Sequence, residues 1–284
     1  MVEGRDPVAM DEWHPIGAID EIPIGADRQT LLMDTPITAT RTDATTPLVR
    51  RSASGATLAT RVKFGYVWTT LGSPDHEVFD IPETDEADRR SLNGGSFIVA
   101  TSAPRAVENF LDMGHFPYVH TGILGAEPRT EVLDYDVTTS ADGILATRCL
   151  FYQPQAAAIA SDGQMTEYVY RVPHPYCVML YKSNPTDPTR MDVIALFNQP
   201  MTAESITAHN FLSLLDDVTT TAAIRSFQQT IFGQDKTILE NQWPKRLPLD
   251  PGAEVPVQAD KSSVSYRRWL SSTGLTYAVI PATP

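Results

Sequence analysis

Cysteine is scarce in this sequence, and its scarcity excludes one kind of cofactor. The 284 residues include only Cys149 and Cys177, too few for a disulfide framework. A Rieske [2Fe–2S] centre takes two cysteines and two histidines as ligands. Neither cysteine precedes a histidine at the spacing that such a centre uses, so the chain cannot hold that cluster by itself.

Basic residues and long apolar runs are also few. The chain has 22 lysines and arginines against 35 aspartates and glutamates, a net charge of −13. This charge argues against binding to nucleic acid or to an anionic membrane surface. No apolar run approaches the length that crosses a bilayer, and the first residues contain no apolar signal core. We therefore expect a cytoplasmic protein.

The residues that are present predict a globular chain in two parts. With 42% hydrophobic and 20% charged residues, the chain can bury a substantial core. Residues 12–72 predict short strands, with a loop over 40–55. The acidic, proline-containing segment 73–95 predicts a connector. We expect one unit over 1–95 and a second over 96–284.

The second part is predicted to be mostly β. A strand is expected over 96–102, and turn signals separate six further strand candidates: 132–138, 144–152, 167–172, 177–182, 191–199 and 205–215. The small and polar segment 153–166 is predicted to be a mobile loop over a pocket. Helical periodicity predicts a long helix over 217–242 and a short one over 262–270.

One segment, ENFLDMGHFPYVH at 108–120, concentrates groups that can bind a metal: Asn109, Asp112, His115 and His120. The first three are spaced by three, which predicts one face of a helix. Pro117 cannot continue the helical ladder, so His120 is expected just past the break, turned back toward His115. Two histidines with room for one carboxylate match the facial triad of non-haem Fe(II) oxygenases. Coincidental histidine spacing is the alternative, but polar groups on an otherwise apolar helix favour a site.

A carboxylate for this site is available far downstream. Asp235 lies on the apolar stripe of the predicted 217–242 helix, with Ile224, Phe227, Ile231 and Ile238. A lone buried carboxylate costs on the order of several kcal/mol unless it is paired or bound to metal. A structural salt bridge is the alternative. We favour Asp235 as the third iron ligand, because the two histidines still need one carboxylate, and Asp112 as the hydrogen-bond acceptor of a ligating histidine.

These segments resemble a known family. Residues 108–120 resemble the N-x2-D-x2-H-x4-H signature of Rieske-type aromatic-ring-hydroxylating and demethylating oxygenases, and FGQDKTILENQWP at 232–244 resembles their carboxylate-bearing segment. The resemblance implies that His115, His120 and Asp235 bind Fe(II). It also implies that Asp112 bridges the iron site to an incoming electron donor, with Asn109 as the adjacent polar residue.

The resemblance implies an α+β fold as well. The expected core is a helix-grip-like antiparallel sheet with iron-bearing helices, preceded by a shortened Rieske-like β remnant. The segments WHP at 13–15 and GYVW at 65–68 resemble the edges of a Rieske domain. The cluster-binding loops between them are missing.

Within the family, several stretches are most similar to methylxanthine demethylases without a Rieske centre of their own. The resemblance implies the catalytic component of a multicomponent monooxygenase that uses O2 to remove an N7-methyl group from a methylxanthine-like substrate as formaldehyde. Electrons would come from NAD(P)H through a separate reductase that carries flavin and a [2Fe–2S] Rieske cluster. A small structural subunit or a second oxygenase subunit is the other partner to consider, in a trimer-based oligomer.

Two alternatives remain open from the sequence. The chain could catalyse another N- or O-demethylation or hydroxylate an aromatic ring. It could instead be a non-catalytic subunit that keeps the fold and stabilises a partner oxygenase. The complete set of three metal ligands weighs against the second alternative.

Overall fold

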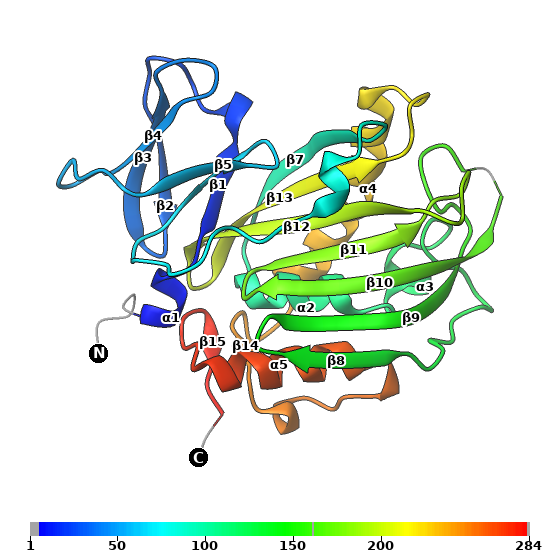
Figure 1. Cartoon of the computed structure of the whole chain (residues 1–284). Coiled ribbons are helices and arrows are strands. Elements are labelled where there is room, and N and C mark those ends of the chain that lie inside the picture. Colours follow the sequence, from blue (N-terminus) through cyan, green and yellow to red (C-terminus); the bar gives the residue numbers. More distant parts are fainter. Residues whose placement is uncertain (1–5, 161, 283–284) are drawn as a thin grey trace.

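The computed structural model describes residues 6–160 and 162–282, and its largest element is an antiparallel sheet of seven strands (Figure 1). The strand order is β7-β13-β12-β11-β10-β9-β8. The strands are β7 (Arg90–Val99), β8 (Asp136–Ser140), β9 (Gly143–Gln153), β10 (Gln164–His174), β11 (Cys177–Ser183), β12 (Met191–Thr202) and β13 (Ser205–Leu214). The six strands predicted between 132 and 215 are confirmed.

Strand β7 begins at Arg90, six residues before the predicted strand. The predicted connector over 73–95 was therefore too long at its C-terminal end. Asn93, Gly94 and Gly95 look like a turn in the sequence, but they form an irregular part of β7, where the pairing with β13 shifts register. Such a β-bulge tolerates glycine and bends the strand without ending it.

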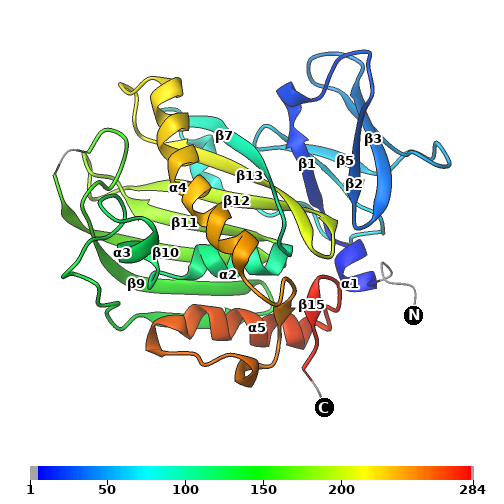
Figure 2. The ribbon, with the colours of Figure 1, turned by 180° about the vertical axis from the view of Figure 1, so that it is seen from behind.

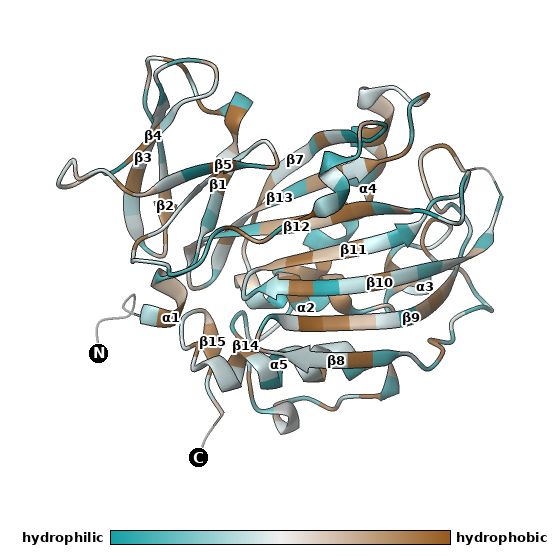
Figure 3. Cartoon of the chain, viewed as in Figure 1, coloured by the Kyte–Doolittle hydropathy of each residue, from teal (hydrophilic) through white to brown (hydrophobic). Residues whose placement is uncertain are grey.

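Alternation along the central strands assigns each residue to one of two faces. On β12, Val193, Ala195 and Phe197 pack into one apolar cluster, whereas Ile194 and Leu196 face the other side, toward the helices. Both faces of these strands are therefore buried. Figure 3 shows the consequence, because β11 and β12 carry long hydrophobic stretches.

The helices cover one face of the large sheet (Figure 2). They are α2 (Ala103–Leu111), α3 (Phe116–Val119), α4 (Thr221–Asn241) and α5 (Lys261–Thr273). The two predicted helices near 217–242 and 262–270 are confirmed as α4 and α5. Within residues 6–160 and 162–282, no helix is long and apolar enough to cross a membrane. The sheet and its helices confirm the predicted α+β class.

The N-terminal part packs on the opposite face of the sheet, over β12 and β13. Two three-stranded sheets build it, β1-β6-β5 and β2-β3-β4, from β1 (His14–Ala18), β2 (Arg28–Leu32), β3 (Thr35–Arg41), β4 (Pro47–Arg51), β5 (Thr60–Lys63) and β6 (Tyr66–Thr69). The loop predicted over 40–55 was partly wrong, because β4 lies in it and pairs with β3.

Aromatic side chains join the N-terminal part to the sheet. The Trp68 ring lies 5.1 Å from the Phe197 ring, and Phe197 stacks on Phe211 at 5.6 Å. All three side chains are buried. The N-terminal part therefore fills this side of β12 and β13, and the helices lie on the other side of these strands. Short elements complete the chain: α1 (Pro7–Met10), β14 (Leu247–Pro248) and β15 (Val279–Ile280).

Candidate metal centre and adjoining pocket

The polar motif does not lie on one helix. α2 ends at Leu111, and Asp112 caps it with extended backbone, φ −80° and ψ 120°. A second helix, α3, then begins at Phe116 with Pro117 in its first turn. The prediction of one helix that ends at Pro117 was therefore wrong. A proline fits the first turn of a helix, where its missing N–H would have no partner, so Pro117 starts α3 rather than ending α2.

The turn between the two helices still brings Asp112 and His115 together. His115 Nδ1 lies 2.9 Å from Asp112 Oδ2, and the Gly114 amide donates to Asp112 Oδ1 over 2.7 Å. His115 and His120 then flank the single turn of α3 as its two caps. Their Nε2 atoms are 3.1 Å apart, so His120 does turn back toward His115, as its position after Pro117 predicted.

Asp235 reaches the histidines from α4. Its Oδ1 atom lies 3.0 Å from His120 Nε2 and 3.3 Å from His115 Nε2. The buried stripe of α4 differs slightly from the predicted one, because Ile238 is 45% exposed and the buried residues are Ile224, Gln228, Phe232 and Leu239. Asp235, with a side chain 15% exposed, borders this stripe on the side of the two histidines.

The hydrogen bonds of the two imidazoles show what the centre requires. His115 Nδ1 faces the Asp112 carboxylate, and His120 Nδ1 faces Gln234 Oε1 at 2.8 Å. Both Nδ1 atoms must carry the proton and donate, because both partners are acceptors. In the neutral rings, both Nε2 atoms then present lone pairs to each other and to Asp235 Oδ1. Three acceptor atoms this close need a shared cation between them.

The donor set fits a mononuclear metal. The three donor atoms lie within 4.8 Å of one another. Donors held about 2.1 Å from one ion at right angles are about 3.0 Å apart, close to the observed separations of 3.0, 3.1 and 3.3 Å. Asp235 Oδ1 is also closed to solvent and has no hydrogen-bond partner within the described part of the chain. A metal ion would satisfy this oxygen.

Without a metal, a proton takes the place of the cation. Burial lowers the pKa of His115, but the carboxylates of Asp112 and Asp235 outweigh burial and raise that pKa to about 9. Burial raises the pKa of Asp235, and the two histidines overcome this effect and lower it below its usual value. The centre therefore favours a positive charge held between negatively charged oxygens.

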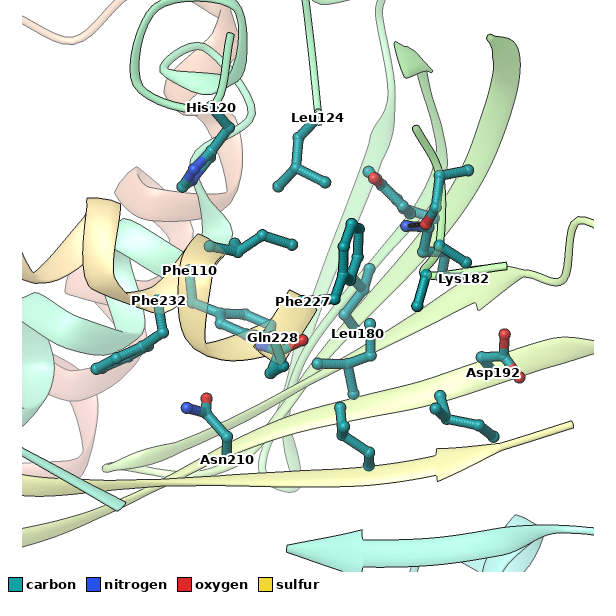
Figure 4. A pocket seen from close by; sticks show the side chains of 18 of the residues that line it. Phe110, His120, Leu124, Leu180, Lys182, Asp192, Asn210, Phe227, Gln228 and Phe232 are labelled. Carbon is teal, nitrogen blue, oxygen red and sulfur yellow. Dashed lines mark hydrogen bonds between the residues drawn. The ribbon is translucent and has the colours of Figure 1, made fainter. Parts of the chain in front are cut away.

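A pocket opens beside this centre on the helical face of the sheet (Figure 4). Its cavity volume is about 110 Å³, and most of its lining is apolar, including Phe110, Phe116, Leu180, Ile231 and Phe232. Alternate residues of β10 to β13 form the floor. Ala156 to Ile159 also line it, so the segment predicted as a loop over a pocket does cover one.

A separate groove lies on the other side of the motif. Asn109 and His115 border both cavities, whereas Asp112, with a side chain 28% exposed, lines only the groove. The groove has a cavity volume of about 230 Å³ and includes Ile238 and Val255. His115 thus stands between a mostly apolar pocket and a groove in which Asp112 is open to solvent.

The four remaining histidines lie outside the centre. His14 and His174 are buried against each other, 5.7 Å between ring centres, and His76 is near Glu12 at 3.5 Å. His209 Nδ1 pairs with the Ser96 hydroxyl. His14 Nε2 donates to the Ala9 carbonyl over 2.7 Å, so His14 is structural.

Sequence reasoning missed several polar residues of the site, among them Gln234, Lys182 and Asn210. Gln234 could have been found, because it directly precedes Asp235 in the segment that carries the carboxylate. Lys182 and Asn210 lie on strands whose register decides which face they occupy. That register follows from pairing in the sheet, and no local signal in the sequence reports it.

Sequence comparisons relate the chain to known demethylases. Residues 99–274 match a family model described as the vanillate O-demethylase oxygenase C-terminal domain. The chain is 46% identical over 278 residues to a probable methylxanthine N7-demethylase, NdmC, from Pseudomonas sp. (strain TJI-51), a match that covers 97% of this chain and 98% of that protein. It is 28% identical over 217 residues to methylxanthine N1-demethylase NdmA from Pseudomonas putida, with coverage of 73% and 58%.

A solved structure shares the fold. The structure of NdmA from Pseudomonas putida CBB5 with caffeine superposes with a TM-score of 0.76 at 16% sequence identity. The match covers 92% of this chain and 90% of that one. The shared architecture therefore includes the N-terminal sheets as well as the large sheet and its helices.

Proposed function

The chain belongs to the Rieske-type non-haem iron oxygenase family, and we propose that it is the catalytic component of an O2-dependent enzyme that removes the N7-methyl group of a methylxanthine-like substrate. We propose further that His115, His120 and Asp235 hold the Fe(II) of this enzyme. One observation carries the assignment: three acceptor atoms meet at 3.0–3.3 Å, with both histidine Nδ1 protons committed to other partners.

Fe(II) bound at this centre would supply O2 activation, and formaldehyde would leave after the methyl group is hydroxylated. The chain itself supplies position and shelter. Phe110, Phe116 and Phe232 provide aromatic surfaces beside the centre, suited to a flat ring. The apolar lining also keeps water from the reacting methyl group. Asp112 and Gln234 hold the two imidazoles in the orientation that leaves both Nε2 atoms free for the metal.

The electron supply must come from outside this chain, because its two cysteines cannot form a Rieske site. We propose a partner reductase that carries flavin and a [2Fe–2S] Rieske cluster and takes electrons from NAD(P)H. Its cluster would dock in the groove at Asp112, whose carboxylate is partly exposed and hydrogen-bonded to His115. Because NAD(P)H is the reductant, the proposed location is the cytoplasm.

Three further proposals concern assembly. The division into a shortened, cluster-free β unit over 1–95 and an iron-binding unit over 96–284 remains a proposal. A trimer-based oligomer is proposed from the family to which the chain belongs. A small structural subunit or a second oxygenase subunit is proposed to complete the complex.

The test of the function compares two aspartates. Asp235→Asn should abolish both bound iron and formaldehyde release from 7-methylxanthine, because one metal ligand loses its charge. Asp112→Asn should keep iron near one per chain but lose most turnover driven by the reductase, since the proposed bridge is removed. Iron content is measured after anaerobic Fe(II) loading, and formaldehyde in the presence of a Rieske-containing reductase.

Either of two results would contradict the proposal. Wild-type protein that takes up no iron would favour the non-catalytic subunit. Full reductase-driven turnover by Asp112→Asn would remove Asp112 from the electron path. The matched family model is that of an O-demethylase, so an aryl methyl ether belongs in the same assay as the alternative substrate class. Ring hydroxylation would appear as a hydroxylated product without formaldehyde.

A further inference from the structure

Asn210 is a buried amide without a partner at the floor of the pocket. It lies on β13 and lines the pocket together with Leu212 and Leu214, at alternate positions of the strand. Its side chain is fully buried. Neither Nδ2 nor Oδ1 has a hydrogen-bond partner among the residues that the structure describes. A buried amide in this state destabilises the folded protein.

The bulge in β7 creates the place that Asn210 occupies. Asn210 pairs with Gly95 and Phe211 pairs with Asn93, so Gly94 is the extra residue. A Cβ atom on Gly94 would lie 3.1 Å from Asn210 Cβ and 3.4 Å from Gln228 Cγ. A larger residue at 94 would therefore press on both side chains, which glycine avoids. β-Bulges beside active sites commonly re-aim a side chain in this way.

α4 holds the bulge in place. Arg225 Nε donates to the Asn93 carbonyl over 2.8 Å, and Gln229 Nε2 donates to the Gly94 carbonyl over 3.3 Å. The helix that carries Asp235 is therefore tied to the strand segment that positions Asn210. Metal ligand and amide are thereby held at a fixed spacing. Figure 4 shows Asn210 across the pocket from His120, below Gln228.

The two charged groups at the pocket floor, Lys182 and Asp192, have partners. Lys182 Nζ donates to the Ala156 carbonyl. Asp192 accepts from Asn184 Nδ2 over 2.9 Å and from the Leu215 amide over 2.8 Å. Asn210 differs from both, because neither its donor nor its acceptor has a partner among the described residues. The Tyr170 hydroxyl, which also lines the pocket, lacks one as well.

We propose that Asn210 is a specificity-determining residue that hydrogen-bonds the amide edge of a ring substrate, a carbonyl oxygen next to a ring nitrogen. A carboxamide offers one acceptor and two donors on a flat group, which complements such an edge. The inference rests on the proposed function, since it adds a recognition group to the same pocket. It places the amide edge of the ring toward β13 and the methyl group toward the metal centre.

The first test measures stability without any ligand. Asn210→Leu keeps the approximate shape of the side chain and removes the two unpaired polar atoms. If the amide is held for a ligand, the variant should melt higher than wild type, by about 2–4 °C, because none of the residues that the structure describes bonds the amide. A lower melting temperature would overturn the inference, since it would show that the amide stabilises the fold.

The second test measures affinity by calorimetry on the iron-loaded, anaerobic protein without reductase. The probes are 7-methylxanthine and 7-methylpurine, which share the ring and methyl group and differ in the carbonyl groups. Asn210→Leu should weaken binding of 7-methylxanthine about 10-fold or more and change binding of 7-methylpurine little. The control Leu212→Met alters the same strand and face, and should affect both probes equally.

Equal losses for both probes in Asn210→Leu would assign the residue to packing and overturn the inference. Wild-type protein that binds neither probe would contradict the proposed methylxanthine substrate instead. In that case, the role of Asn210 is tested by comparing the binding of pyridone and pyrimidinone rings with the binding of the corresponding rings that lack the carbonyl group. A wild-type preference for the ring amides that Asn210→Leu loses would support the inference, and no preference would overturn it.

Discussion

Gln234 sets the orientation of one of the two imidazoles at the proposed metal centre. Its Oε1 atom accepts the hydrogen bond of His120 Nδ1 over 2.8 Å, which keeps His120 Nε2 unprotonated and directed at Asp235. This partner stands directly before Asp235 on α4, so one turn of helix supplies both the ligand and the group that orients another ligand.

Replacing Gln234 should therefore weaken metal binding without removing a ligand. We predict that Gln234→Leu lowers Fe(II) affinity about 10- to 100-fold, because His120 can then adopt the other tautomer. Gln234→Glu keeps an acceptor and should bind iron more tightly than the leucine variant. Thr237→Val, at an exposed position on the same helix, is the control. Competition with a coloured chelator under anaerobic conditions measures the affinities, and equal affinities in all variants would refute the orienting role.

Lys182 is a buried cation in the pocket floor, and its burial has a cost that depends on pH. Burial lowers its pKa from 10.5 to about 7, although Asp192 acts in the opposite direction. Between these two values the unfolded chain binds more protons than the folded chain. The free energy of unfolding should therefore rise with pH from about 7 to 10.5 through this residue, by up to about 1.4 kcal/mol per pH unit.

The substitution Lys182→Met isolates this contribution. It should remove part of the rise in stability between pH 7.5 and pH 9.5, and it should stabilise the protein most at the lower of these pH values. Urea unfolding at both pH values measures the difference. Lys236→Met, on the partly exposed side of α4, is the control that should leave the pH dependence unchanged. The same rise in wild type and Lys182→Met would contradict the assignment.

A buried ion-pair network joins α2 to α5 beside the metal centre. Glu108 on α2 accepts from Arg267 Nε over 2.6 Å and from Arg105 Nη1 over 2.9 Å. Glu254 contacts both arginines. Because Glu108 lies four residues before Asp112, the network holds the end of α2 where the motif begins.

Removing one arginine should leave a buried charge undercompensated. We predict that Arg267→Met lowers the free energy of unfolding by about 3 kcal/mol, since Glu108 loses the shorter of its two hydrogen bonds to arginine. Arg268→Met changes the exposed neighbour on the same helix and should cost less than about 0.5 kcal/mol. Chemical denaturation at pH 7 compares the two variants. Equal stabilities would mean that the network contributes nothing net.

The large sheet is a shared wall between the N-terminal sheets and the helical side. Phe197 is fully buried in this wall, against Trp68 and Phe211. Phe197→Ala should therefore cost about 3–5 kcal/mol although the residue lies on the face away from the metal. Leu145 is 40% exposed, so Leu145→Ala should lower the free energy of unfolding much less. Urea unfolding with fluorescence detection tests both, and a small loss for Phe197→Ala would mean that the two parts pack loosely.

The elements that local pattern controls were predictable. Turn residues and apolar alternation placed β9 to β13 within a few residues, and helical periodicity placed α4 and α5. Elements that depend on strand pairing were harder to predict. The sequences of β4 and of the first half of β7 are typical of loops, and they form strands because they pair with β3 and β13. The family resemblance is confirmed by the matched model over 99–274 and the 46% identical relative.

The sequence by itself determined the inventory of the centre: a chain without a Rieske cluster, two histidines five apart, and one aspartate on a helix face. These follow from residue types and short spacings, which the linear order contains. Only the tertiary structure decided that Pro117 starts α3, and that Asp235, 115 positions after His120, comes to 3.0 Å from it. The tertiary structure alone also left Asn210 without a partner among the described residues, because strand register and the packing of α4 on β7 arise from contacts between segments distant in the chain.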